Sequence, residues 1–392
     1  MRIAIVGCGF VADYYMKTLP GHPELQVTGV YDRSRLRCAQ FASYHNVPTY
    51  RSLEEVLADA RVDIVLNLTN PRSHYEVSRA CLLGGKHVYS EKPLAMKLDE
   101  ARELVELAEE RKLLISSAPC SLLGETAQSV WKAIREDAIG KVRLVYAEMD
   151  EGMVFRMPYK KWTSESGAPW PYKDEFEVGT TIEHAGYVVS WMPAIFGPAL
   201  TITGFSTCLF PDKETDVPLD VISPDFAVAC IRFASGIVAR LTCSLVASHD
   251  HSLRVVGDRG ELSVRDTWYY AAPISIRRWV NFRGRHIEIP WRKKYPLAAK
   301  GVRYHYRGTQ QMDFARGVAE LAAAVTEQRP NRLSARYSLH VNEIVLAVNN
   351  AMENGNTYHM TTTFEPVAPM PWATGNEPSP QKIKTTQRLS QA

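Results

Sequence analysis

Short apolar runs alternate with helical patterns from residue 1 to about residue 120. Each run is apolar almost without interruption, which is typical of a strand covered on both faces of a sheet. After Pro93, apolar residues recur at helical spacing opposite a charged face, at Ala101, Leu104, Val105 and Ala108. Because crossover helices of this kind join parallel strands, the pattern predicts a doubly wound α/β domain. The predicted strands are 3–6, 27–31, 64–66, 87–89 and 113–115.

The pattern changes after about residue 135 to runs of strand character with few helical patterns between them. Turn signals such as Ala234-Ser235-Gly236 and Asp258-Arg259-Gly260 separate neighbouring runs. We therefore expect a second α/β domain with a large, mainly antiparallel sheet. Its predicted strands are 142–149, 202–209, 226–233, 238–245, 253–256, 262–264 and 274–280, and its predicted helices are 125–135, 181–196, 310–327 and 336–352.

These patterns divide the chain into three parts. Residues 1–121 form the predicted doubly wound domain, and residues 122–365 form the second domain. From Pro366 onward the chain is rich in proline and polar residues, with too few apolar side chains to bury a core. We expect residues 366–392 to form a flexible tail.

Composition narrows the class of partner. The chain has 392 residues, of which 45% are hydrophobic and 23% charged, and this is enough for two globular domains. A formal net charge of +3 gives no strong field for nucleic acid or an anionic membrane surface, and no uncharged apolar run has spanning length. We therefore expect a small-molecule partner, with no nucleic acid and no membrane.

The cysteines and the start of the chain favour a cytoplasmic protein. Seven cysteines are widely scattered without a Cys-x-x-Cys pair, as expected of reduced packing residues. A core strand begins almost directly after Met1, which leaves no room for a signal peptide.

A glycine-rich turn follows the first predicted strand. The sequence Gly7-Cys8-Gly9-Phe10-Val11-Ala12 is a Gly-x-Gly-x-x-Ala turn that opens a helix. In such a turn Gly7 allows the tight bend, Gly9 lets the backbone approach a pyrophosphate, and Ala12 permits close packing of helix on strand. The helix N-terminus, with Phe10 and Val11 in its first turn, presents free N–H groups to the anion. The turn predicts a dinucleotide-binding site.

Asp32 supports this prediction. It ends the strand predicted at 27–31, twenty residues after Ala12, where an acidic ribose ligand is expected. A carboxylate accepts hydrogen bonds from the ribose hydroxyls and repels a 2′-phosphate, so Asp32 favours NAD. Arginines that could hold the 2′-phosphate of NADP follow at once, at Arg33, Arg35 and Arg37.

Two polar loops follow neighbouring strands at the same edge of the predicted sheet. Thr69-Asn70-Pro71 follows the strand at 64–66, and Ser90-Glu91-Lys92-Pro93 follows the strand at 87–89. Open α/β sheets bind ligands at the carboxyl ends of their strands. A lone lysine is more often a solvated surface charge, so the argument for Lys92 depends on its place. We expect the nicotinamide side to be lined by Thr69, Asn70, Pro71, His74, Glu91 and Lys92.

Together, the turn at 7–12, Asp32, Thr69-Asn70-Pro71-x-x-His74 and Glu91-Lys92-Pro93 resemble the Gfo/Idh/MocA family of NAD(P)-dependent oxidoreductases. This family includes glucose-fructose oxidoreductase and inositol dehydrogenases. The resemblance continues in the segments 313–321, 329–335 and 340–344, and so covers nearly the whole chain. It implies a Rossmann-like N-terminal domain and a C-terminal α/β domain whose open sheet often serves oligomerisation. We accordingly expect a homodimer or homotetramer.

The second-domain signature departs from the family pattern. Members commonly carry Asp-x-Gly-x-His-x-x-Asp on the helix that faces the nicotinamide. Counting back from Gly197 places at these positions Glu183, Ala185, Tyr187 and Ser190. Glu183 and Tyr187 are four residues apart and so share a helix face, where a phenol can replace the imidazole as proton donor. A free tyrosine titrates near ~10, so it needs a neighbouring cation, for which Lys92 is the candidate.

His184 competes with Tyr187 for this role. It is the better acid–base group at neutral pH, and the two residues are neighbours at i, i+3 on a helix. Register favours Tyr187. Glu183 and His184 could also be a buried hydrogen-bonded pair that only fixes the packing of the helix.

Three other features have weaker functional interpretations. His249-Asp250-His251 could ligate a metal, but a two-residue spacing without further ligands argues against it, and we expect no metal site. The basic segment 277–294 resembles a nucleic-acid surface, yet its alternation favours a solvated sheet face or edge, with a sugar-nucleotide phosphate as second choice. Aromatic residues that could stack on a sugar or pack in the core or a lid are Trp162, Trp170 and Tyr172.

The sequence thus predicts reversible hydride transfer between a nicotinamide and a secondary alcohol of a sugar, sugar derivative or cyclitol. Lys92 would polarise the substrate oxygen and lower the pKa of Tyr187, Tyr187 would pass the proton, and Glu183 would orient the pair. Family resemblance also admits two alternatives: an NAD-dependent glycoside hydrolase and a dinucleotide-sensing regulator without catalysis.

Overall fold

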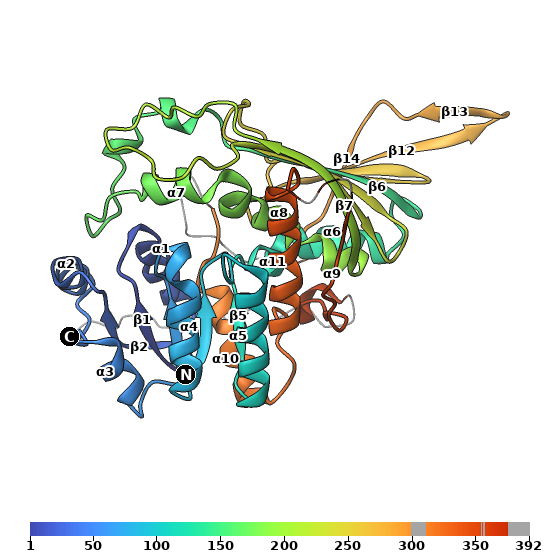
Figure 1. The fold of residues 1–392 in the computed structure, drawn as a ribbon. Coiled ribbons are helices and arrows are strands. Elements are labelled where there is room, and N and C mark those ends of the chain that lie inside the picture. The colour runs from blue at the N-terminus through green and yellow to red at the C-terminus, as the bar shows by residue number, and fades with distance from the viewer. Residues whose placement is uncertain (299–310, 354, 356, 375–392) are drawn as a thin grey trace, which may run out of the picture.

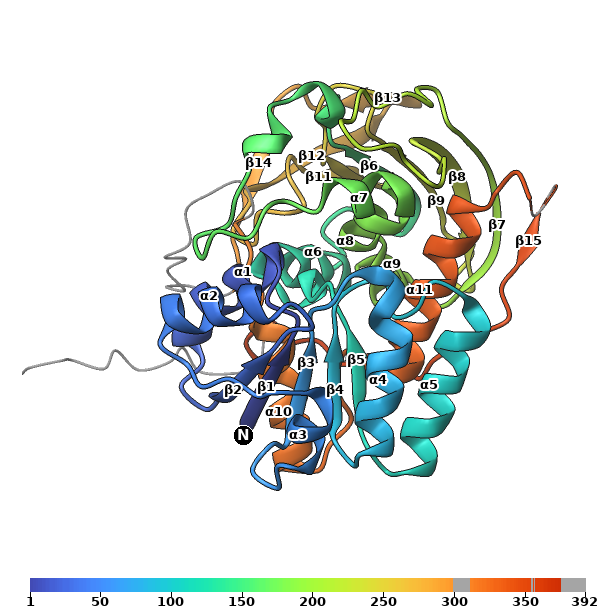
Figure 2. The ribbon, with the colours of Figure 1, turned by 60° about the vertical axis from the view of Figure 1, so that its left-hand side comes forward.

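The structure is a computed structural model that describes residues 1–298, 311–353, 355 and 357–374. In the N-terminal part of the described chain, a five-stranded sheet has the order β2-β1-β3-β4-β5, with every neighbouring pair parallel (Figures 1 and 2). The strands are β1 (Arg2–Val6), β2 (Gln26–Tyr31), β3 (Ile64–Asn67), β4 (His87–Ser90) and β5 (Ile115–Ser117). The predicted parallel α/β sheet is confirmed.

Both faces of this sheet are buried, which is why its strands are apolar throughout. Because successive side chains of a strand point to opposite faces, Ile3 and Ile5 of β1 enter one core while Ala4 and Val6 enter the other. Helices α1, α2 and α10 contribute to the first core, and helices α3, α4 and α5 to the second. Their bounds are α1 (Phe10–Thr18), α2 (Arg35–His45), α3 (Leu53–Ala58), α4 (His74–Leu83), α5 (Leu98–Glu110) and α10 (Arg316–Glu327).

A second sheet occupies the later part of the chain. Its ten strands among the described residues follow the order β13-β12-β11-β10-β6-β9-β8-β7-β15, and β14 also pairs with β12. All neighbours are antiparallel except β6 and β9, so the predicted mainly antiparallel sheet is confirmed. The strands are β6 (Val142–Asp150), β7 (Ala199–Thr207), β8 (Phe226–Phe233), β9 (Val238–Ser244), β10 (Leu253–Gly257), β11 (Gly260–Val264), β12 (Ile274–Phe282), β13 (Arg285–Glu288), β14 (Lys293–Tyr295) and β15 (Tyr358–His359).

The basic segment 277–294 lies at one end of this sheet. Figure 1 shows β12 and β13 projecting from the body of the protein as a hairpin. Every residue of β13 is exposed, because nothing in the described chain covers that end. This agrees with the interpretation of the segment as a solvated sheet edge.

The helix predicted at 181–196 is interrupted. A π-helical turn (Thr181–Ala185) leads into α8 (Gly186–Val189), and α9 (Met192–Phe196) begins separately after it. Pro193 lies in the first turn of α9, where its missing N–H costs no intrahelical hydrogen bond. A further helix that the pattern did not predict, α7 (Tyr172–Val178), precedes the π-helical turn. By contrast, α6 (Glu125–Arg135) has the predicted bounds.

The C-terminal helices connect the two sheets. Helix α10 packs on β4, with Gly317 so close to Tyr89 that an added Cβ would lie 2.2 Å from the phenol oxygen. Helix α11 (Ala335–Asn349) packs on α5 and on β7, and Figure 1 shows it running between the two halves of the molecule. In the described part of the chain, no helix combines the length and apolar character needed to cross a membrane.

Part of the predicted tail is docked on the protein. Ala373 is fully buried and its carbonyl accepts a hydrogen bond from Arg135, while the Met370 N–H donates to Gln128. Both partners lie on α6, so this part of the predicted tail makes specific contacts with that helix. The remainder of the predicted tail, 375–392, lies outside the described residues.

The turn after β1 has two glycines in very different surroundings. Gly7 has a φ of +102°, and an added Cβ would lie 2.5 Å from the backbone of Leu68. At Gly9 an added Cβ would meet no atom within 4 Å. Only the first position therefore requires glycine for the fold itself.

We expect Gly7→Ala to lower the free energy of unfolding by about 1–3 kcal/mol, because both the backbone conformation and the clash with Leu68 oppose a side chain. The matched variant Gly9→Ala should change it by less than about 1 kcal/mol. Urea unfolding followed by circular dichroism measures both values. Equal losses in the two variants would contradict this account of the turn.

Candidate active site

The predicted cofactor residues lie along one edge of the parallel sheet. Gly7 to Gly9 follow β1, Asp32 follows β2, Thr69 and Asn70 follow β3, and Glu91 and Lys92 follow β4. Because neighbouring parallel strands end at the same edge, these segments converge there. The edge faces the second domain, from which Glu183 comes into contact with Lys92.

The glycine turn fits a pyrophosphate. Gly9 borders open space, and no side chain caps the N-terminus of α1, which leaves its first N–H groups available to an anion. Ala12 is fully buried against the sheet, as close helix packing requires, while Phe10 and Val11 are half-buried in the first turn. These features match the cradle that a dinucleotide needs.

The carboxylate of Asp32 is fixed at the end of β2. Its two oxygens accept hydrogen bonds from the backbone N–H groups of Cys8, at 2.9 Å, and Ser34, at 2.7 Å. Asp32 thereby joins the glycine turn to the loop after β2. Arg33 is exposed, and the Arg37 guanidinium lies 4.0 Å from the carboxylate of Asp32. The Asp32 carboxylate and the side chains of Arg33 and Arg37 thus all follow the end of β2.

His74 ties together the two loops that follow β3 and β4. It is fully buried, and its ring nitrogens lie 2.7 Å from the carbonyl oxygen of Pro93 and 3.0 Å from that of Thr69. Burial lowers the pKa of His74. Thr69, Asn70 and Pro71 are partly exposed at the sheet edge, so of this group only His74 is inside the domain. Its two hydrogen bonds hold the loops after β3 and β4 together inside the domain.

Lys92 reaches from the parallel sheet into the second domain. Its ammonium forms an ion pair with Glu183 and lies 5.9 Å from the ring centre of Tyr187. Burial alone would lower the pKa of Lys92, but Glu183 and the other acidic groups nearby together outweigh burial and raise the pKa above the ordinary value. The neighbouring Glu91 is anchored by the Tyr15 hydroxyl, which donates to its carboxylate at 2.8 Å. Lys92 is therefore a buried, charged ammonium.

Glu183 comes from the π-helical turn and Tyr187 from α8. Burial raises the pKa of Glu183 to about 7, although Lys92 acts in the opposite direction. Burial also raises the pKa of Tyr187 well above 10, and the lowering effect of Lys92 does not offset it. The expected net lowering of the Tyr187 pKa is thus not found. The phenol is protonated at neutral pH, and its hydroxyl makes no hydrogen bond within the described residues, so it is free to donate one.

His184 faces a different set of groups. Its ring nitrogens lie against the carboxylates of Glu175 and Glu151, the second at 3.0 Å. Burial would lower the pKa of His184, but the two carboxylates outweigh burial and raise it to about 10. The ring also stacks on Trp268. The structure therefore pairs His184 with carboxylates, and it places Tyr187, not His184, beside Lys92.

Three further residues contact the group formed by Lys92, Glu183, His184 and Tyr187, and the sequence patterns did not indicate them. Glu151 follows β6, Glu175 lies on α7, and the Trp268 indole packs 4.6 Å from the ring of Tyr187. No local spacing signals them, because the three come from separate parts of the chain. The aromatic residues Trp162, Trp170 and Tyr172 pack against a separate hydrophobic cluster, in which the ring centres of Trp162 and Trp170 lie 5.2 Å apart.

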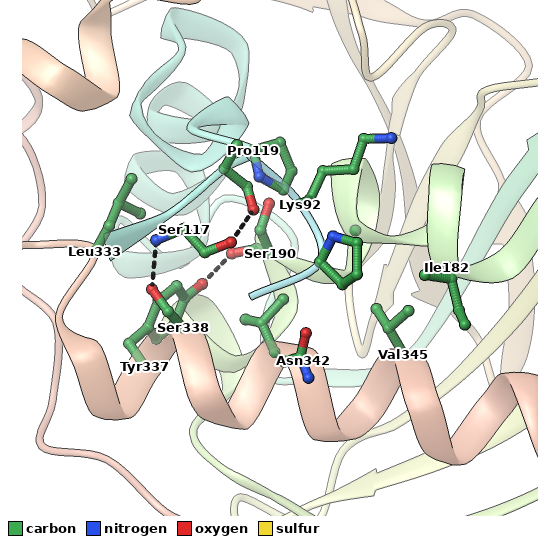
Figure 3. Close-up of a pocket in the computed structure, with 14 residues that line it drawn as sticks. Lys92, Ser117, Pro119, Ile182, Ser190, Leu333, Tyr337, Ser338, Asn342 and Val345 are labelled. Atoms are coloured by element: carbon green, nitrogen blue, oxygen red, sulfur yellow. Dashed lines mark hydrogen bonds between the residues drawn. The ribbon is translucent and has the colours of Figure 1, made fainter. Parts of the chain in front are cut away.

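A largely apolar cavity lies behind Lys92 (Figure 3). It is bordered by the backbone of Lys92 and Pro93, by the segment 117–119 and by α11. In Figure 3 the ammonium of Lys92 points away from the labelled side chains of α11. Ser190, at the fourth position of the family signature, borders this cavity and is held by the Ser121 hydroxyl at 2.9 Å. The cavity therefore borders Lys92 on the side away from its ammonium.

Similar proteins support the interpretation of both domains. One relative is an uncharacterized oxidoreductase of Synechocystis, 24% identical over 271 residues, which are 67% of this chain and 71% of the relative. Another is the trans-1,2-dihydrobenzene-1,2-diol dehydrogenase of Bos taurus, 23% identical over 74% of this chain and 80% of the relative. Among solved structures, the UDP-N-acetylglucosamine 3-dehydrogenase of Acidithiobacillus ferrooxidans is similar in fold, with a TM-score of 0.67 and 19% identity over 90% of this chain and 97% of that chain.

Two family models match the chain and together span more than half of it. Residues 1–118 match the oxidoreductase family with an NAD-binding Rossmann fold, and residues 127–263 match the GFO/IDH/MocA C-terminal domain. The resemblance seen in the glycine turn and in Glu91-Lys92-Pro93 is thereby confirmed. The chain belongs to the Gfo/Idh/MocA family of NAD(P)-binding oxidoreductases.

Proposed function

We propose that the protein is a dehydrogenase that moves a hydride between a nicotinamide and a secondary alcohol carbon of a sugar, sugar derivative or cyclitol. One observation carries this proposal: Lys92 from the parallel sheet and Tyr187 from the second domain lie side by side, with Glu183 as the counter-ion of the lysine. A cation beside a phenol whose hydroxyl makes no hydrogen bond to the described residues can take part in transfer of an alcohol proton.

In this proposal each residue has a separate task. The bound dinucleotide supplies the hydride acceptor, and the Gly7–Gly9 turn with Asp32 holds it. Lys92 polarises the substrate oxygen, and Tyr187 passes the alcohol proton. Since Lys92 lies beside Tyr187 and is paired with Glu183, the Lys92 ammonium can release a proton to that carboxylate and take up the phenol proton, while Tyr187 accepts the proton of the alcohol. His74 and Glu91 are positioning residues that hold the loop carrying Lys92.

The names of similar proteins support the substrate class. A UDP-N-acetylglucosamine 3-dehydrogenase and a trans-1,2-dihydrobenzene-1,2-diol dehydrogenase both carry names for oxidation of ring hydroxyls. A ring hydroxyl of a sugar or cyclitol is a secondary alcohol of the same kind. Neither the glycoside hydrolase nor the sensor alternative has comparable support.

NAD is the proposed cofactor in preference to NADP. The Asp32 carboxylate is buried and fixed by two backbone N–H groups, so it cannot move away from a 2′-phosphate. Arg33 and Arg37 are exposed and would have to outweigh this fixed negative charge.

We also propose that the protein assembles as a homodimer or homotetramer. Large apolar side chains are exposed on the second sheet, on β7 at Leu200 and Phe205 and on β12 at Val280 and Phe282. A second copy of the chain would remove such surface from water.

We expect the protein to act in the cytoplasm. All seven cysteines are unpaired thiols in the structure, and an oxidising compartment would favour disulfides.

Lys92→Ala and Tyr187→Phe should each lower kcat by about 10²–10⁴-fold, because each removes a group that acts on the proton of the alcohol. Affinity for the dinucleotide should stay nearly unchanged. The assay screens sugars, nucleotide sugars and inositols with NAD and NADP and follows the absorbance of the reduced cofactor. The matched controls are Lys97→Ala, an exposed lysine nearby, and Tyr146→Phe, a tyrosine on the second sheet. Undiminished turnover in both test variants would refute the assignment.

Alcohol oxidation should become faster as the pH rises through about 7, because Glu183 must be deprotonated to accept the proton. The reduction direction needs the protonated carboxyl group and should show the opposite dependence. In Glu183→Gln, kcat/KM should no longer change as the pH rises through about 7. If the variant keeps the wild-type pH profile, another group is the titrating one.

The wild-type protein should bind NAD more tightly than NADP in a fluorescence titration. Asp32→Ser should shift the ratio of the two dissociation constants toward NADP by about 10-fold or more, because it removes a charged acceptor of the ribose hydroxyls. Loosening of the glycine turn affects both dinucleotides, so the ratio separates recognition from folding. Wild-type affinity for NADP equal to or above that for NAD would overturn the choice of cofactor.

A further inference from the structure

A second cluster of potential ligands lies beside the proposed active site. Glu151 directly follows β6, while His249 and His251 precede β10. Strands β6 and β10 are antiparallel neighbours, and Asp150 and Asp250 form a bridge that extends their pairing. The pairing therefore brings the end of β6 to the start of β10. Consequently, the imidazoles of His249 and His251 meet the carboxylate of Glu151, which lies about 100 residues earlier in the sequence.

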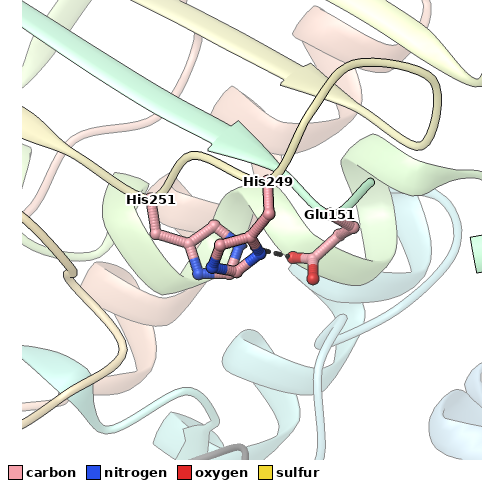
Figure 4. Close-up of side chains that lie close together, drawn as sticks. All are labelled: Glu151, His249 and His251. Atoms are coloured by element: carbon pink, nitrogen blue, oxygen red, sulfur yellow. Dashed lines mark hydrogen bonds and ion pairs between the residues drawn. The ribbon is translucent and has the colours of Figure 1, made fainter. Parts of the chain in front are cut away.

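The three side chains converge on one point (Figure 4). One ligand atom from each residue lies within 4.8 Å of the others. The His251 Nε2 atom is 3.0 Å from the Glu151 carboxylate, and the rings of His249 and His251 have centres 4.1 Å apart. His251 is 2% exposed, whereas His249 is exposed and its ring nitrogens make no hydrogen bond within the described residues. The imidazole of His249, which makes no hydrogen bond to the described residues, thus lies beside a buried imidazole and a partly buried carboxylate.

We propose that Glu151, His249 and His251 bind a divalent zinc ion. Two imidazoles and one carboxylate are a typical protein ligand set for catalytic zinc, which keeps a fourth position for water or substrate. Imidazole nitrogens disfavour magnesium and calcium, which prefer oxygen ligands. The expectation of no metal depended on the lack of a ligand beyond His249 and His251 in the local sequence, and tertiary structure supplies Glu151 as that ligand.

The zinc site adjoins the residues that we propose for proton transfer. The Trp268 ring packs 4.5 Å from His251 and 4.6 Å from Tyr187, so one indole separates the metal ligands from the phenol. Glu151 also lies 3.0 Å from His184, the residue next to Glu183. If the proposed function holds, the open position of the zinc binds a hydroxyl of the polyol substrate and orients it toward Tyr187. Zinc binding itself does not depend on that function.

The test uses untagged full-length protein, dialysed against a chelator and then titrated with ZnCl2 by calorimetry. All samples carry Cys230→Ser, because Cys230 is an exposed thiol that could bind zinc. We expect one zinc per chain. His249→Ala and Glu151→Gln should each weaken binding by at least about 100-fold, beyond the effect typical of residues around a ligand set. The matched control is His286→Ala, an exposed histidine on β13, which should bind zinc as the wild type does.

Cobalt substitution provides the second measurement. CoCl2 should give visible absorption bands of a four- or five-coordinate site in the wild type and lose them in His249→Ala. Since His249 is exposed, this variant should keep the wild-type thermal unfolding curve, which separates loss of a ligand from loss of the fold. Zinc stoichiometry well below one, or binding that His249→Ala leaves unchanged, would overturn the proposal.

The outcomes also separate this inference from the proposed function. Turnover of a polyol by protein that binds no zinc would refute only the metal site. Zinc binding by protein that turns over no sugar or cyclitol would refute only the dehydrogenase proposal. If both hold, removal of zinc should raise KM for the polyol more than it lowers the affinity for NAD.

Discussion

The buried ion pair between Lys92 and Glu183 joins the two halves of the molecule at the proposed site. Lys92 follows β4 of the parallel sheet, and Glu183 comes from the π-helical turn of the second domain. Buried ion pairs contribute little net stability, because desolvation of both charges offsets their attraction, but loss of one partner leaves an uncompensated charge. The pair therefore constrains geometry: the loop after β4 and the π-helical turn must stay together for either charge to remain buried.

The ionisable groups around this ion pair also lie in contact with partners. His184 lies between Glu151 and Glu175, and Glu151 in turn contacts His251. Positive and negative groups thus alternate from the sheet edge to the end of β6, with Trp268 packed against His184, His251 and Tyr187. In this setting the hydroxyl of Tyr187 makes no hydrogen bond to the described residues, and the ring that carries it lies beside the Lys92 ammonium. A substrate oxygen would complete the arrangement.

Local chemistry in the sequence predicts much of the proposed site. The glycine turn, Asp32 and Glu91-Lys92-Pro93 each follow an apolar strand, and the carboxyl ends of parallel strands necessarily lie at one edge. It could not show that His74 is enclosed between two carbonyl groups, nor that burial keeps the Tyr187 phenol protonated despite Lys92. Both properties depend on how deeply the side chain is buried in the fold. The spacing of residues along the chain does not show this burial.

By itself, the sequence determined the parallel sheet, the antiparallel sheet and the family, because hydrophobic period and turn chemistry act over a few neighbouring residues. Helix register favoured Tyr187 over His184 as the acid–base group beside Lys92, and tertiary structure decided between the two. His184 and Tyr187 are only three residues apart, and the carboxylates that hold His184 come from the residue after β6 and from α7. The meeting of Glu151 with His249 and His251 has the same origin. Pairing of β6 with β10 joins segments about 100 residues apart, and no short-range pattern specifies that register.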